Sequence, residues 1–130
     1  MIWTALALSL LAPPVQAGAP KPVKVDAKCP TGNRGKFSLT VDPWQAIVVP
    51  GQGIEWSLTT NNNKNQDIEI SAKDPDHWLY VNTTVKGKNK VLMTTMVDET
   101  PGATYDYDIT VYCEGYDPIV LDPRIKVEGG

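Results

Sequence analysis

One stretch of this sequence restricts the fold more than any other, because apolar residues occupy every second position from residue 105 to residue 113. Successive side chains of a β-strand point to opposite faces, so a period of two predicts a half-buried strand. Polar residues such as Asp106 and Asp108 fill the opposite face. The residues expected on the buried face are Tyr105, Tyr107, Ile109, Val111 and Cys113.

The same alternation recurs along most of the chain, with glycine and proline turns between the repeats. No segment keeps the period of about 3.6 residues that a helix needs. The sequence therefore predicts an all-β fold of about eight short strands, arranged as a β-sandwich. The expected strands cover residues 36–42, 44–49, 54–58, 67–71, 78–81, 91–97, 105–113, 119–121 and 125–127, and the basic stretch 86–90 is expected to be a turn.

Residues 1–17 have the pattern of a secretory signal peptide. An apolar run over residues 2–12 is too short to span a bilayer, and small residues precede the expected cleavage point after Ala17. Residues 18–28 are rich in proline, alanine and lysine, and we expect an N-terminal arm there that ends in a strand. The β-sandwich domain is expected over residues 29–130 of a secreted, extracellular or periplasmic protein.

Cys29 and Cys113 are the two cysteines of the chain. An exported protein with an even number of cysteines normally oxidises them, so we predict a disulfide between these two residues. In the chain-entropy model, a bond that closes so long a loop stabilises the folded state by about 4 to 5 kcal/mol. That is a large part of the total stability of about 5–15 kcal/mol that a small domain has.

Two stretches together resemble parts of a known fold. Residues 47–56 read Ile-Val-Val-Pro-Gly-Gln-Gly-Ile-Glu-Trp, and residues 101–107 read Pro-Gly-Ala-Thr-Tyr-Asp-Tyr. They are similar to the strand, glycine turn and strand of the cupredoxins, the Greek-key sandwiches of blue-copper proteins, and to that family's Gly-x-x-Tyr-x-Tyr stretch. The resemblance spans most of residues 36–127. It implies a cupredoxin-like Greek-key sandwich, and an immunoglobulin-like sandwich is the alternative.

The residues that bind copper in that family are missing at the matching positions. A blue-copper site needs two imidazoles, a thiolate and usually a weak axial thioether. His77 is the only histidine, and Gln66 and Ile109 stand where the resemblance would place the upstream histidine and the cysteine ligand. The resemblance therefore implies a copper-free domain without a cofactor.

Other metal chemistry has weaker support in the sequence. His77 with Met93 and Met96 is an alternative set for copper(I), because thioethers suit that soft ion. Two strand residues three positions apart point to opposite faces, however, which favours core packing for the methionines. The acidic run over residues 98–122 lacks the fixed spacing of a calcium loop.

Several classes of function are disfavoured by what the sequence lacks. No serine occupies a Gly-x-Ser-x-Gly turn, so we expect no enzyme. The net charge of −3 disfavours nucleic-acid binding. No stretch after residue 17 is long and apolar enough to span a membrane. Asn82 begins the glycosylation sequon Asn-Thr-Thr, which matters only in a eukaryotic secretory pathway.

The turn after the 105–113 strand is the candidate partner-binding edge. Loops on a rigid sandwich carry function, and tyrosine is enriched at interfaces. The candidate binding residues are Tyr112, Glu114, Tyr116 and Asp117.

We therefore expect a secreted or periplasmic, non-enzymatic binding or structural module that binds a protein or a surface. Two alternatives come from other classes. One is a metal-handling protein that uses His77, Met93 and Met96. The other is a subunit of an extracellular assembly that self-associates through residues 18–28.

Adding copper(II) to the pure protein tests the missing ligand set. We expect no intense visible band from thiolate-to-copper charge transfer, because the chain has one imidazole and both thiols are expected in the disulfide. Absorption spectra recorded before and after copper addition measure this directly. An intense charge-transfer band would contradict the prediction.

Overall fold

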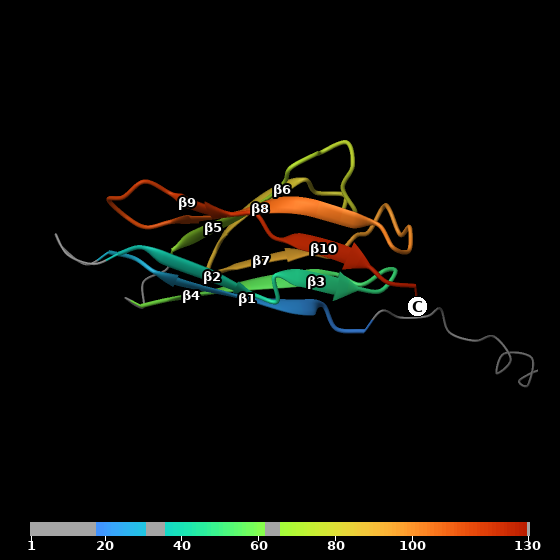
Figure 1. Ribbon diagram of the computed structural model, residues 1–130, viewed down its shortest axis with the longest axis horizontal. Helices are drawn as coiled ribbons and strands as arrows, with labels where there is room; N and C mark the ends of the chain where they lie inside the picture. The colour runs from blue at the N-terminus through green and yellow to red at the C-terminus, as the bar shows by residue number, and fades with distance from the viewer. Residues whose placement is uncertain (1–17, 31–35, 62–65, 130) are drawn as a thin grey trace, which may run out of the picture.

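The computed structural model describes residues 18–30, 36–61 and 66–129, and its strands form two stacked layers (Figure 1). The expected signal peptide, residues 1–17, lies outside the described residues. The described part of the chain has no helix, and therefore none long and apolar enough to cross a membrane. The prediction of an all-β sandwich is confirmed.

Ten strands form two mixed sheets in the part of the chain that the structure describes. The first sheet has the order β2-β1-β4-β7, and the second has the order β3-β10-β8-β5-β6, with β9 paired to β8. The strands are β1 (Lys21–Lys28), β2 (Ser38–Asp42), β3 (Gln45–Val48), β4 (Ile54–Thr60), β5 (Asp67–Ala72), β6 (Thr84–Lys88), β7 (Lys90–Met93), β8 (Thr104–Tyr112), β9 (Ile119–Leu121) and β10 (Arg124–Val127).

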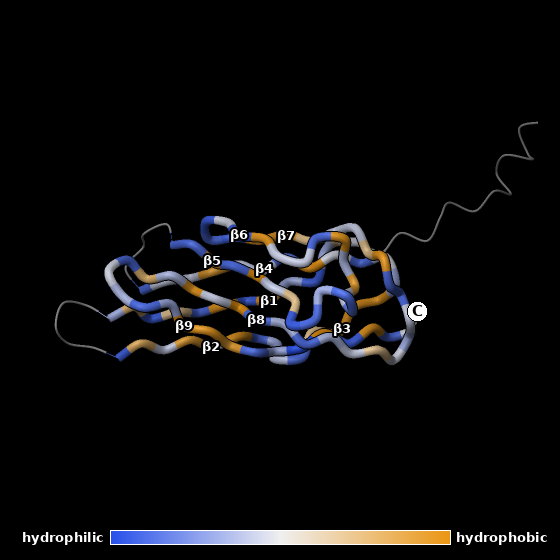
Figure 2. The backbone as a smooth tube through the Cα atoms, turned by 90° about the horizontal axis from the view of Figure 1, so that it is seen from above, coloured by the Kyte–Doolittle hydropathy of each residue, from blue (hydrophilic) through white to orange (hydrophobic). Residues whose placement is uncertain are grey.

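The core lies between the two sheets and is built from alternate residues of their strands. Trp56 of β4 and Ile109 and Val111 of β8 are completely buried, as their places in the alternating pattern predict. Figure 2 shows hydrophobic and hydrophilic residues alternating along the strands. The four expected core residues of β8 and Cys113 directly after it are all buried, so the buried face inferred from the period of two is confirmed.

The disulfide between Cys29 and Cys113 is present, with a distance of 5.8 Å between the two Cα atoms. Cys29 directly follows β1 of the first sheet, and Cys113 directly follows β8 of the second. The bond therefore joins the two layers at the end of the sandwich where both strands finish. Both cysteines are buried against the core.

Residues 18–28 do not form an arm separate from the sandwich. Lys21–Lys28 is β1, which pairs with β2 on one side and with β4 on the other. Val23, Val25 and Ala27 contribute side chains to the core. The domain thus begins before the expected boundary at residue 29. Residues 24–27 are paired with strands on both edges, and self-association through residues 18–28 stays a prediction.

Two further strand expectations differ from the structure. Residues 78–81 were expected to form a strand, but they form only an isolated bridge between Tyr80 and Met96. Trp78, Leu79 and Tyr80 are all buried, whereas a strand at the surface of a core would bury alternate residues. Residues 86–88 continue β6, and the turn consists of Asn89, whose φ is 62°. Gly87 is required within the strand, because a Cβ atom there would collide with the backbone carbonyl oxygen of Lys90.

An aromatic cluster fills the centre of the core. The Trp56 indole N–H donates a hydrogen bond of 3.0 Å to the Tyr107 hydroxyl, which links β4 of one sheet to β8 of the other. The Trp78 ring packs against Tyr105 and Tyr107, and the Tyr80 hydroxyl donates to the Gln52 carbonyl oxygen at 2.7 Å. Burial raises the pKa values of the Tyr80 and Tyr107 hydroxyls well above their usual value.

Replacing Tyr107 with phenylalanine should destabilise the domain by about 1–3 kcal/mol, because the buried Trp56 N–H loses its acceptor. Urea denaturation followed by tryptophan fluorescence measures this change in the free energy of unfolding. Tyr112→Phe is the matched control, since the Tyr112 side chain is only half-buried, and it should cost less than about 1 kcal/mol. Equal stability of Tyr107→Phe and the wild type would contradict the assigned hydrogen bond.

Candidate functional site

The loop over residues 113–118 lies at the disulfide end of the sandwich, beside the start of β5 and the end of β6. Figure 1 shows this loop at the left of the molecule, between β8 and β9. A positive φ of 84° at Gly115 reverses the chain, and the Tyr116 amide donates to the Cys113 carbonyl oxygen at 3.0 Å. The disulfide and the turn together hold the loop at this end.

A pocket of about 310 Å³ opens beneath this loop. Three of the four predicted binding residues, Tyr112, Glu114 and Tyr116, line it, whereas Asp117 is exposed in the same loop outside the lining. Its volume is at the lower end of the range for small-ligand pockets, about 300–1,000 Å³. The full lining is Gln66, Asp67, Lys88, Tyr112, Cys113, Glu114 and Tyr116.

The Tyr112 ring already binds an ammonium group. Lys86 Nζ lies 4.2 Å from the centre of this ring, which is within the range of a cation–π interaction. The Tyr112 hydroxyl donates to Glu69 Oε1 at 3.3 Å, which fixes the ring in place. Tyr116, across the loop, is 42% exposed. The pocket thus presents two tyrosine rings, and one of them is held rigidly.

The charges on the wall of the pocket fall into two groups. Asp67 is paired with Lys88 at 2.8 Å and with Lys86 at 3.6 Å. The hydrogen bond from Lys88 lowers the pKa of the Asp67 carboxyl below its usual value. Glu114 and Asp117 form no ion pair with any residue that the structure describes. The loop therefore contributes two carboxylates that are available to a ligand.

Gln66 is a residue of the pocket that the sequence analysis did not include among the candidate binding residues. It is 5% exposed, and its backbone exchanges hydrogen bonds with Asn89: the Gln66 amide donates to Asn89 Oδ1, and the Asn89 amide donates to the Gln66 carbonyl oxygen. Its side-chain amide has no hydrogen-bond partner among the described residues. The residue lines the pocket, and an amide side chain can both donate and accept hydrogen bonds, so this group is suited to bind a ligand there. Lys88 also lines the pocket, and the sequence analysis did not include it because residues 86–90 were expected to be a turn.

The residues of the alternative copper(I) set lie elsewhere. His77 is exposed after the far end of β5 and stacks on Tyr105, with the ring centres 4.8 Å apart. Met93 is buried in the core, and the Met96 sulfur accepts a hydrogen bond from the Gly51 amide at 3.3 Å. Among the residues described by the structure, no group of three or more His, Cys, Asp or Glu side chains could hold a metal ion.

Comparison with known proteins adds no family assignment. No family model matches this sequence, and no curated protein sequence matches it either. What the protein does is therefore inferred from the chemistry of its own surfaces.

Proposed function

We propose that this protein is an exported, non-enzymatic binding module, a copper-free sandwich of the cupredoxin-like or immunoglobulin-like type. Its loop over residues 113–118 recognises a basic segment of a partner protein. One observation carries the proposal: a pocket at the disulfide end combines two tyrosine rings, the carboxylate of Glu114, which forms no ion pair with a described residue, and the side-chain amide of Gln66.

Charge favours a basic partner over a neutral or acidic one. Residues 98–122 contain seven acidic residues and no lysine or arginine. Asp106 and Asp108 of this segment are paired with Arg124 and Lys73, on the outer face of the second sheet. Acidic charge without an ion pair therefore remains in the loop, where it attracts a cationic ligand.

The tyrosine rings add a contact that a carboxylate alone does not provide. Lysine and arginine side chains bind to aromatic faces as well as to carboxylates, and the Lys86 ammonium over the Tyr112 ring is an internal example. Tyrosine also buries a large area with little loss of side-chain freedom, which suits a contact residue. A lysine or arginine side chain in this pocket would meet an aromatic ring, a carboxylate and a side-chain amide.

A binding assay with defined peptides tests the proposal. The probe is a fluorescently labelled lysine-rich peptide, and a glutamate-rich peptide of equal length serves as the negative probe. We expect the lysine-rich peptide alone to bind, and Glu114→Gln/Asp117→Asn to weaken its affinity about three- to tenfold, as removal of exposed charges does. Fluorescence anisotropy measures both affinities.

Asp74→Asn/Asp76→Asn is the matched control. It changes the net charge by the same amount, at exposed positions beyond the opposite end of β5. It should leave the affinity for the lysine-rich peptide within about twofold of the wild type, since distant exposed charges are screened. Equal weakening by both double variants would show attraction by net charge only, and would contradict the assignment of the loop.

A further inference from the structure

The outer faces of the two sheets differ in how many of their charged side chains form ion pairs. On the six-stranded sheet, carboxylates of β5 and β8 are paired: Asp67 with Lys88, Asp108 with Lys73, and Asp106 with Arg124. On the four-stranded sheet, the ion pair found among the described residues is a long one, Lys90 to Glu55 at 3.8 Å. The outer face of the four-stranded sheet therefore leaves more of its polar groups available for binding.

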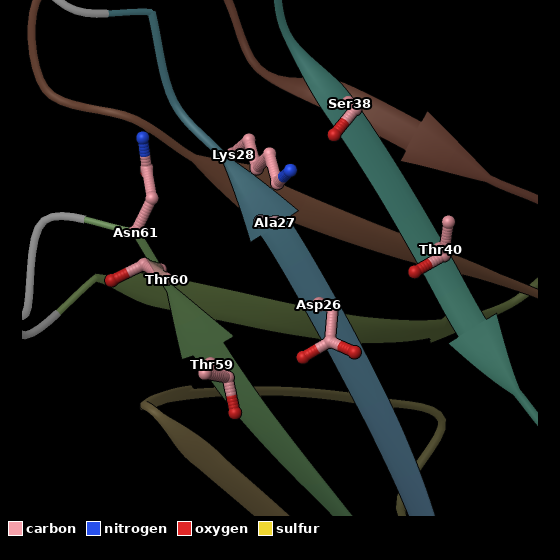
Figure 3. Close-up of a pocket in the computed structure, with 8 residues that line it drawn as sticks. All are labelled: Asp26, Ala27, Lys28, Ser38, Thr40, Thr59, Thr60 and Asn61. Carbon is pink, nitrogen blue, oxygen red and sulfur yellow. The ribbon is translucent and has the colours of Figure 1, made fainter.

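A hollow of about 420 Å³ lies on the outer face of the four-stranded sheet, over the ends of β1 and β4 and the start of β2 (Figure 3). The strand register places Asp26 of β1 between Thr40 of β2 and Thr59 of β4. One step along the same face, Lys28 is opposite Ser38. Figure 3 shows the Asp26 carboxylate between the two threonines, so charged and hydroxyl groups lie side by side across three strands.

Five polar side chains of this hollow form no hydrogen bond or ion pair within the described structure. Asp26 and Lys28 form no ion pair with a described residue, and the hydroxyls of Ser38, Thr40 and Thr59 have no hydrogen bond within the described structure. Asn61 on the wall differs from them. Its side chain donates to the Cys29 carbonyl oxygen at 3.2 Å and accepts from the Cys29 amide at 2.9 Å, so it fixes the wall to the disulfide.

The mixture of groups selects a class of ligand. A carboxylate only accepts hydrogen bonds, an ammonium group only donates them, and hydroxyls do both. The Asp26 carboxylate would repel an anion and the Lys28 ammonium would repel a cation, so two nearby charges of opposite sign disfavour a ligand of either charge. A ligand with many hydroxyl groups can donate to Asp26, accept from Lys28 and do both with the threonines.

We propose that this hollow is a binding site for a neutral carbohydrate, in addition to the loop site on the other sheet. Thr40 and Thr59 also carry methyl groups, which the C–H groups of a sugar ring can contact. The lining contains no aromatic ring. Stacking on an aromatic face is therefore missing, and the dissociation constants should be in the millimolar range.

NMR titration of the isotopically labelled full chain tests the site. The probes are cellobiose, lactose, mannobiose and chitobiose, with sodium sulfate as an anionic probe. We expect at least one disaccharide to shift the backbone amide signals of Asp26, Thr40 and Thr59. Sulfate should leave these three signals unmoved.

Variants of the floor make the test specific. Thr40→Val/Thr59→Val removes two hydroxyls and keeps β-branched side chains that suit strands, and it should weaken disaccharide binding about fivefold or more. Thr104→Val, an exposed strand position on the other sheet, is the control and should leave the affinity unchanged. Three results would each overturn the proposal. They are the absence of any shift of the three amide signals with every disaccharide, an equal shift of these signals with sulfate, and wild-type affinity of Thr40→Val/Thr59→Val for the disaccharide.

Discussion

The disulfide between Cys29 and Cys113 is the constraint on which the rest of this structure depends. It joins the end of β1 in one sheet to the end of β8 in the other, so it holds the two layers together where the chain leaves both sheets. The Asn61 side chain forms hydrogen bonds with the backbone of Cys29, and the Tyr116 amide donates a hydrogen bond to the carbonyl oxygen of Cys113. The wall of the hollow and the loop over the pocket are thus fixed to the two halves of one covalent link. A rigid support of this kind lowers the entropy lost when a ligand binds.

Much of this fold could be predicted from the sequence, because alternation is a direct consequence of strand geometry. Tyr105, Tyr107, Ile109, Val111 and Cys113 are buried as predicted, and Thr110 of the opposite face is buried as well. The prediction failed where hydropathy and turn composition gave the wrong signal. Trp78, Leu79 and Tyr80 look like a strand but close the core as three consecutive buried residues. Gly87 looks like part of a turn, but it is a strand residue placed close to a neighbouring backbone.

The candidate surfaces could be predicted only in part, because they combine residues that are distant in the sequence. The tyrosine and acidic composition of the loop was visible in the sequence, and three of its four predicted residues line the pocket. The participation of Gln66 depends on the pairing of β5 with β8, which the sequence does not specify. The hollow likewise requires β1 to lie between β2 and β4, whereas the sequence favoured an arm in that region. Neighbouring strands determine which polar groups are paired and which remain available to a ligand.

Equilibrium denaturation of Cys29→Ser/Cys113→Ser beside the wild type tests the central role of the disulfide most directly. If the bond constrains the unfolded chain and joins the sheets, the variant should lose about 4 to 5 kcal/mol of unfolding free energy. The loss should be accompanied by a larger dependence of that free energy on denaturant concentration, because the unfolded variant exposes more surface. A variant as stable as the wild type, with the same denaturant dependence, would contradict the account.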